Sequence, residues 1–280
     1  MSGTETAETV GQLAGRRSIQ SQLLRIFGTA VIALSIIPFI ALLLIALLLP
    51  NLWLLLAAFV VPFLIGAYIY FTRRNYADDL RDFLGAYPAS SNTAPRLVNM
   101  VESLSLSVGI AEPGVYLVDD DCVNAFAIAD GTGGSVGLTT GAINTLGVAE
   151  TEGVVAELLV RIRNGDAQKA SVVAGVFGIT YMDRSSGGIT RRFAERVADD
   201  MISTDRDLMA DKGSIALTNY PPGLRNALVK FSNAGFVPGS ATEGSDYIWM
   251  VRPSTKSSVK TPTEHLSSVE LRIDVLSGKI

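Results

Sequence analysis

The chain has 280 residues, a formal net charge of −4 and a positive mean hydropathy. A soluble domain seldom has so hydrophobic a composition, which indicates a membrane-associated part. The acidic balance argues against a nucleic-acid-binding surface, because such surfaces need clustered Lys and Arg. One cysteine, Cys122, excludes an internal disulfide, and one histidine, His265, excludes a two-histidine zinc site within a single subunit.

Two long apolar stretches, residues 26–49 and 52–71, contain no charged residue and are separated only by Pro50 and Asn51. Each is long enough to cross a bilayer as a helix, and both are too long and too pure for ordinary core helices. A cleaved signal peptide is the alternative for the first stretch, but that stretch is longer than a signal core and a second one follows directly. Arginines flank the pair on both sides, so the positive-inside rule places both termini and the main domain in the cytoplasm.

Hydrophobic spacing along the rest of the chain predicts an α+β, mainly helical domain with a small β-sheet. Helices are expected at residues 75–87, 96–108 and 190–203, and a buried helix or loop at 170–182. Short strands are expected at 114–118, 124–127 and 135–140. The predicted organisation is a cytoplasmic tail (1–25), a two-helix transmembrane hairpin (26–71), a juxtamembrane helix and linker (72–95), and a main cytoplasmic domain (96–280).

Residues 151–166, with the sequence TEGVVAELLVRIRNGD, have the pattern of a helix that packs in a core. Acids precede it, arginines lie near its end, and Asn164 and Gly165 supply a stop. The segment resembles the G-V-x-A-H-E-L-x-H-x-x-N-x-D helix of the HtpX family, membrane-anchored zinc metallopeptidases related to the CAAX prenyl proteases. The residues before it match the family in the same order, at 109–116, 124–127 and 136–141. The resemblance covers roughly residues 96–231.

The resemblance implies a catalytic site whose residues this sequence lacks. In the family, two histidines on this helix bind zinc and a glutamate activates the metal-bound water. Glu157, Leu158 and Arg161 stand at those positions here, and Asp207 stands where the family has its third ligand. A competing alignment puts Glu195 at that third position. Because a guanidinium has no lone pair for a metal and leucine accepts no proton, we expect no cofactor and no catalysis by the family mechanism.

What fills the place of the metal can also be predicted. Glu157 and Arg161 lie four residues apart on the helix, and Asp207 would approach from a second helix if the family geometry holds. Arg161 is therefore expected to lie between two carboxylates in place of the metal. The alternative is a solvated pair on the helix surface, which would contribute little to stability.

The favoured function is a pseudopeptidase that binds a membrane protein or an unfolded peptide in membrane-protein quality control. An active zinc metalloendopeptidase with a non-standard or intersubunit metal site is one alternative, and a structural membrane-assembly protein is another. In peptidases of this architecture, peptides lie along an exposed edge strand before the zinc helix. We expect that edge at Ser135, Val136, Gly137, Leu138, Thr139 and Thr140, unless the turn at 130–134 or the C-terminal part folds over it.

Overall fold

The computed structural model describes residues 75–131, 133–178, 202, 205–253 and 269–278, with isolated positions at 40, 44, 60, 61 and 64. The chain divides into two compact units, Met1–Asn75 and Tyr76–Ile280. The predicted transmembrane hairpin lies outside the described residues. No helix formed by the described part of the chain is long and apolar enough to cross a bilayer.

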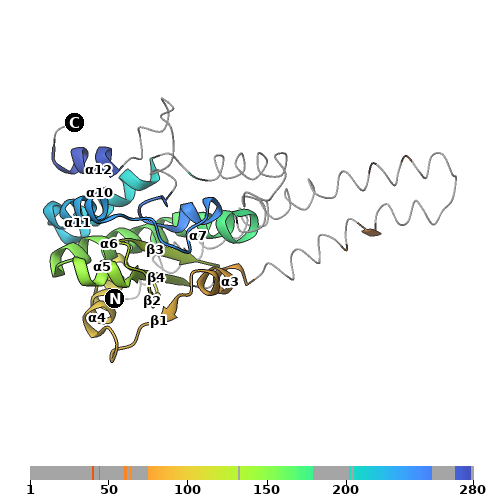
Figure 1. The fold of residues 1–280 in the computed structure, drawn as a ribbon, viewed down its shortest axis with the longest axis horizontal. Coiled ribbons are helices and arrows are strands. Elements are labelled where there is room, and N and C mark those ends of the chain that lie inside the picture. Colours follow the sequence, from red (N-terminus) through yellow and green to blue (C-terminus); the bar gives the residue numbers. More distant parts are fainter. Residues whose placement is uncertain are drawn as a thin grey trace, which may run out of the picture. The chain divides into compact units, whose positions relative to one another are not determined.

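A four-stranded mixed sheet forms one layer of the second unit (Figure 1). Its strands are β1 (Tyr87–Pro88), β2 (Gly114–Val118), β3 (Ala125–Ala129) and β4 (Gly134–Thr139), in the spatial order β1, β2, β4, β3. β2 and β4 are parallel, and the other two pairs are antiparallel. A tight turn joins β3 to β4, and within it the Gly133 amide donates to Asp130 Oδ1 at 2.8 Å. The three strands expected from the sequence are therefore present, and β1 is an addition.

The expectation that residues 135–140 form an exposed edge is wrong. Residues 135–139 belong to β4, which is bonded on one side to β2 and on the other to β3. Thr140 lies outside the strand and begins the next helix. Pairing on both sides buries β4, and a proline at Gly137 would remove a donor from an interior strand. The edge strand beside β4 is β3.

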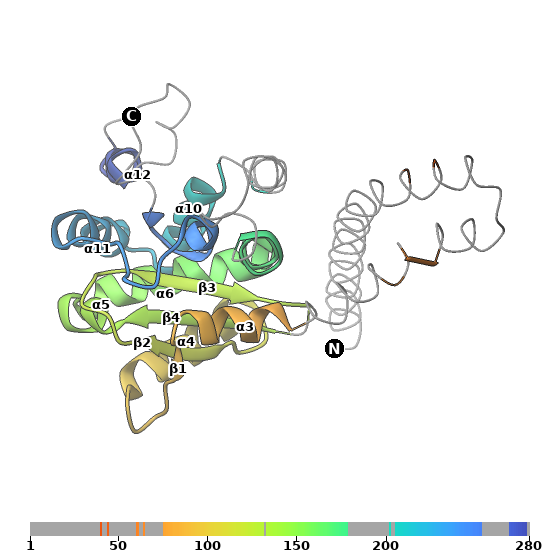
Figure 2. The same cartoon turned by 45° about the vertical axis from the view of Figure 1, so that its right-hand side comes forward.

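Helices cover the sheet, and most of them lie where hydrophobic spacing places them (Figures 1 and 2). The expectations at 75–87 and 96–108 are confirmed, although the first helix ends four residues early, and the helix expected at 190–203 lies outside the described residues. The segment 170–182 is helical as far as the structure describes it. The helices are α3 (Tyr76–Phe83), α4 (Pro95–Val108), α5 (Thr140–Thr145), α6 (Val148–Asn164), α7 (Asp166–Val172) with a π-helical continuation (Val173–Gly178), α10 (Arg206–Thr218), α11 (Pro221–Ala234), a 3₁₀ helix (Glu243–Ile248) and α12 (Val269–Leu276).

Helix α6 lies at the centre of the unit, between the sheet and the pair α10 and α11 (Figure 2). Two glycines allow this close packing. A methyl group on Gly153 of α6 would lie 2.7 Å from the Leu224 backbone nitrogen of α11, and one on Gly213 of α10 would lie 2.6 Å from Val160. The helix ends at Gly165, whose φ of 79° is the left-handed conformation predicted for its stop.

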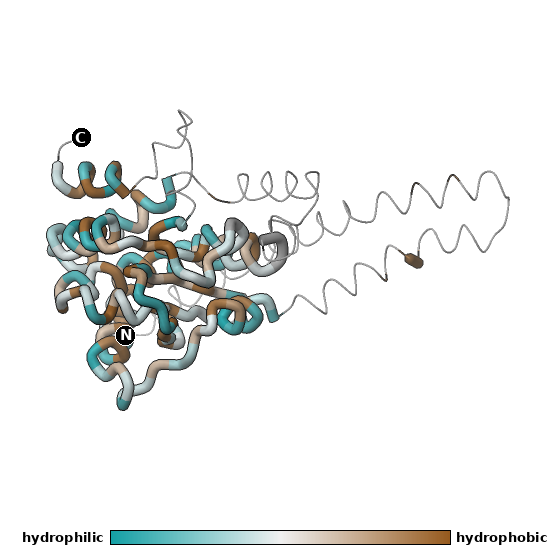
Figure 3. Tube along the Cα trace, viewed as in Figure 1, coloured by the Kyte–Doolittle hydropathy of each residue, from teal (hydrophilic) through white to brown (hydrophobic). Residues whose placement is uncertain are grey.

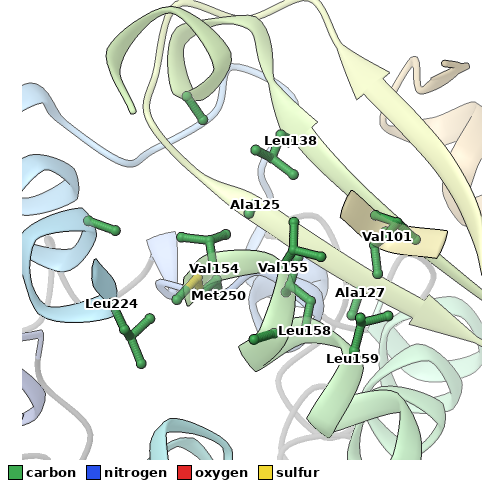
Figure 4. Packing of buried hydrophobic residues seen from close by; sticks show 14 of the residues in the cluster. Val101, Ala125, Ala127, Leu138, Val154, Val155, Leu158, Leu159, Leu224 and Met250 are labelled. Carbon is green, nitrogen blue, oxygen red and sulfur yellow. The ribbon is translucent and has the colours of Figure 1, made fainter. Parts of the chain in front are cut away.

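The hydrophobic core lies between α6 and one face of the sheet. Figure 4 shows Val154, Val155, Leu158 and Leu159 of α6 close to Ala125 and Ala127 of β3 and Leu138 of β4. Helix α4 contributes Val101 to the same cluster. Along α12 hydrophobic and hydrophilic positions alternate (Figure 3), and its buried residues include Arg272. Charged residues therefore enter a largely apolar interior, which requires partners for them.

Candidate functional site: a buried chain of charges

Helix α6 places two ionised side chains inside the protein. Glu157 is 0% exposed and Arg161 is 2% exposed, one helical turn further along. Arg161 donates to Glu157 Oε1 from Nε at 2.8 Å and from Nη2 at 2.5 Å. The spacing of four residues makes this pair, and the acid-first order agrees with the helix dipole. Neither group is solvated, so the alternative of a surface pair is wrong.

Helix α10 supplies a second carboxylate to the same arginine. Arg161 Nη2 lies 3.2 Å from Asp207 Oδ1, so its guanidinium is shared between Glu157 and Asp207. The predicted meeting of these three side chains is confirmed. Asp207 has further cationic neighbours, because Arg206 Nε lies 3.2 Å from Oδ1 and Arg252 Nη2 lies 3.7 Å from Oδ2.

Helix α12 completes the arrangement from the C-terminal end of the described chain. Arg272 binds Asp211 with two bonds, from Nε to Oδ2 at 2.8 Å and from Nη2 to Oδ1 at 2.6 Å. The same Nη2 donates to Glu157 Oε1 at 3.2 Å. The contacts join three acids and three arginines in alternating order, called here the buried charge chain: Asp211, Arg272, Glu157, Arg161, Asp207 and Arg206.

Burial and charge act on these groups in opposite directions. Burial would raise the pKa of Asp207, but Arg161, Arg206 and Arg252 outweigh it and hold that pKa well below its usual range. Burial raises the pKa of Glu157, against the pull of Arg161 and Arg272. Burial also lowers the pKa of Arg206 to about 10, which leaves the guanidinium charged at neutral pH. The arginines are therefore permanent cations that hold Asp207 ionised.

Part of this site has no counterpart in the expectations from sequence. Asp211 and Arg272 are 61 residues apart and were not expected to pair, and no partner was expected for Arg206. One available signal was the spacing of Asp207 and Asp211, which places two acids on the same face of α10. Leu158, at the position of the family's general base, is completely buried in the apolar core.

Of the remaining candidate residues, the structure describes Cys122, which takes no part in the charge chain. His265 and Glu195 lie outside the described residues. Cys122 is partly exposed, and burial with the neighbouring Asp120 raises the pKa of its thiol, which disfavours a reactive thiolate. Asp120 itself accepts hydrogen bonds from the Cys122 and Gly239 amides, as expected of a polar turn.

A chain segment lies directly against the arginines. Residues 247–252, called here the strap, comprise the last two residues of the 3₁₀ helix and the four that follow it, and Trp249 and Met250 lie beside β3. Arg161 donates to the carbonyl oxygens of Trp249 at 3.4 Å and Met250 at 3.3 Å. Arg272 also donates to the Met250 carbonyl, at 2.9 Å. The guanidiniums thus bind main-chain carbonyls as well as carboxylates.

Comparison with known proteins assigns the chain to a family. The model of peptidase family M48 matches residues 91–268. A protein named Protease HtpX homolog from Dictyoglomus thermophilum is 30% identical over 204 residues, which cover 64% of this chain and 66% of that protein. Relatives with the same name from Streptococcus thermophilus and Trichormus variabilis are 27% identical over 251 residues and 34% identical over 176 residues. They are covered over 83% and 61% of their lengths, and this chain over 75% and 53%.

The residues of the charge chain do not fit the zinc ion that the family resemblance implies. A cation between Glu157 and Asp207 would have to occupy the place of the Arg161 guanidinium, within reach of Arg272 and Arg206. Arginine supplies no lone pair, and like charges at this distance repel. Among the described residues, no group of three or more His, Cys, Asp or Glu side chains is arranged to hold a metal.

Proposed function

We propose that this chain, which belongs to peptidase family M48, is a membrane-anchored HtpX-like pseudopeptidase that binds an unfolded peptide or a protein partner without cutting it. In this proposal the two apolar stretches at 26–71 anchor the main domain at the cytoplasmic side of the cell membrane. The partner belongs to membrane-protein quality control, where an extended segment of a damaged membrane protein is the expected ligand.

One observation carries the proposal. Arg161 lies buried between Glu157 and Asp207, at the place where the resemblance puts the catalytic metal. A fixed cation there supplies positive charge without a metal-bound water, so it stabilises the fold and generates no nucleophile. Leu158 provides no proton acceptor beside it. Binding of an extended backbone needs neither a metal-bound water nor a proton acceptor, so recognition can persist without hydrolysis.

The test uses the full-length protein in detergent with an unfolded casein-like polypeptide. We expect the polypeptide to be bound and recovered intact, with or without added zinc or chelator. The matched variant Glu157→Ala should also leave the polypeptide uncut.

Cleavage that chelator abolishes, and that Glu157→Ala removes, would instead establish an active metalloendopeptidase. A protein that neither binds nor cuts the polypeptide would favour a structural role in membrane assembly.

A further inference from the structure

The strap lies along β3 in the way a bound peptide adds to the edge of a sheet. Trp249 forms an antiparallel bridge with Phe126, and the Met250 amide donates to the Ala125 carbonyl at 2.7 Å. The Asn124 side chain binds both main-chain polar groups of the next residue: its Nδ2 donates to the Val251 carbonyl at 2.8 Å, and its Oδ1 accepts from the Val251 amide at 3.2 Å. Main-chain bonds of this kind hold extended peptides with little regard to sequence.

Three arginines of the buried charge chain bind main-chain carbonyls of the strap. Arg206 donates to the Tyr247 carbonyl at 2.9 Å, Arg161 contacts the Trp249 and Met250 carbonyls, and Arg272 donates to Met250 at 2.9 Å. A guanidinium presents several donors in a fixed plane, so it can hold a carboxylate and a carbonyl at once. Arg161 and Arg272 therefore bind carbonyls of the extended part of the strap as well as the acids, and Arg206 binds a carbonyl in the last turn of the 3₁₀ helix.

Two side chains of the strap, Trp249 and Met250, pack closely against buried residues of the domain. Trp249 is completely buried and meets Phe126 edge to face, with ring centroids 5.6 Å apart. Phe126 lies over Gly137 of β4, where a methyl group would come within 2.2 Å of the ring. Met250 enters the core near Val154 and Leu224 (Figure 4). The position beside Phe126 accepts a flat aromatic side chain the size of an indole.

Two buried polar atoms at the contact between the strap and the charge chain have no hydrogen-bond partner among the described residues. They are Trp249 Nε1 and Glu157 Oε2. Buried polar atoms without partners cost stability. Trp249 Nε1 leaves with the strap, so a peptide gains over the strap if it donates a hydrogen bond to Glu157 Oε2.

From these contacts we infer that the strap is an internal peptide ligand, which closes a site for extended peptides at the edge of β3. The inference rests on the proposed function, because it names the surface where a peptide is bound. The ligand is an unfolded segment whose aromatic side chain enters the Trp249 position and whose carbonyls face Arg161, Arg206 and Arg272. It binds by exchange with the strap.

Competition from the strap limits the apparent affinity of the site for a free peptide. A tethered segment has an effective concentration on the order of millimolar, so it outcompetes a similar free peptide at micromolar concentration. Weakening the strap should therefore open the site to a peptide supplied in trans.

The experiment measures binding of a labelled peptide with the sequence of residues 245–253, SDYIWMVRP, to the full-length protein in detergent. The wild type should bind it at least about tenfold more weakly than Trp249→Ala does, because its own strap competes. The peptide should also raise the melting temperature of Trp249→Ala, whereas a peptide with alanine in place of tryptophan should not. Tyr220→Ala, which removes an exposed aromatic residue outside the strap, should behave as wild type.

A second variant, Trp249→Phe, keeps most of the buried ring and guards against loss of folding. If Trp249→Ala or Trp249→Phe is folded and binds the peptide no better than wild type does, the strap is an ordinary part of the core and the inference is overturned. The outcome is independent of the proteolysis test: cleavage by the wild type would end the pseudopeptidase proposal without affecting peptide exchange.

Discussion

Arg161 is the residue that joins two carboxylate-bearing helices, since Glu157 of α6 and Asp207 of α10 both contact its Nη2 atom. Burying an ion pair costs desolvation, and the attraction within the pair offsets that cost only while the partners are complete. Removing one partner leaves the others buried without their full counter-charge. The stability of the domain should therefore depend on this arginine much more than on a surface arginine.

The substitution Arg161→Met tests this dependence. It should lower the free energy of unfolding by roughly 3 kcal/mol, because two buried carboxylates lose a shared partner. Arg163→Met, two residues along the same helix but exposed, is the control and should change stability by less than about 0.5 kcal/mol. Thermal or urea unfolding of the full-length protein measures both, and equal midpoints for the two variants would contradict the role given to Arg161.

Asp207 gives the charge chain a pH dependence. Its pKa lies below the usual range in the folded state, so its contribution to stability is present above its unfolded pKa of about 4 and is lost as the pH falls through the folded value. We expect the melting temperature of the wild type to fall with acidification below about pH 4 more steeply than that of Asp207→Asn. Because the raised pKa of Glu157 acts in the opposite direction, the comparison with the variant isolates Asp207. Parallel curves for the two proteins would refute this assignment.

At the scale of elements, the packing of β3 on β4 depends on Gly137. A side chain there would collide with Phe126, the residue against which Trp249 packs. Gly137→Ala should destabilise the protein by about 1–3 kcal/mol through overpacking. Gly133→Ala, in the turn between the same strands with open space around it, is the matched control. Comparable unfolding midpoints for the two alanine variants would show that Phe126 has room to move.

The elements that the sequence predicts well are those with a long hydrophobic period. Helix α4 buries one face at helical spacing, α6 carries apolar residues at the same spacing although Gly153 to Arg161 are all buried, and Gly165 ends α6 where its dihedral freedom is needed. Helix α5 was not predicted, because its six residues, Thr140–Thr145, are too few and too polar to show a hydrophobic period. Periodicity therefore located individual elements, and short ones escaped it.

The arrangement of the strands could not be predicted in the same way. The turn after β3 implies that β3 and β4 are neighbours, but no local pattern shows that β2 pairs with the other side of β4. The edge of the sheet was therefore expected at the wrong strand. The candidate site divides similarly. The contact between Glu157 and Arg161 could be predicted from their spacing, and the approach of Asp207 from the family resemblance. Asp211 and Arg272 lie far apart in the sequence and meet only through the tertiary fold.

For the molecule as a whole, α6 connects the core to the charged interior. One side of it packs on the sheet, and the other side faces α10 and α11 and carries Glu157 and Arg161 into contact with α10 and α12. The family resemblance implies that the corresponding helix of active members binds the metal. Here its ionised residues hold three helices and the strap together. The charge chain thus links α6, α10 and α12 through ion pairs, beside the hydrophobic core that packs α6 on the sheet.

The central claim, that a guanidinium takes the place of the metal, is tested most directly by the metal content of the purified full-length protein. Elemental mass spectrometry, after exposure to zinc and removal of the excess, should find much less than one zinc per chain, and the same value for Asp207→Ala. A content of about one zinc per chain, the stoichiometry of a catalytic site in this class of peptidase, that is lost in Asp207→Ala would contradict the account.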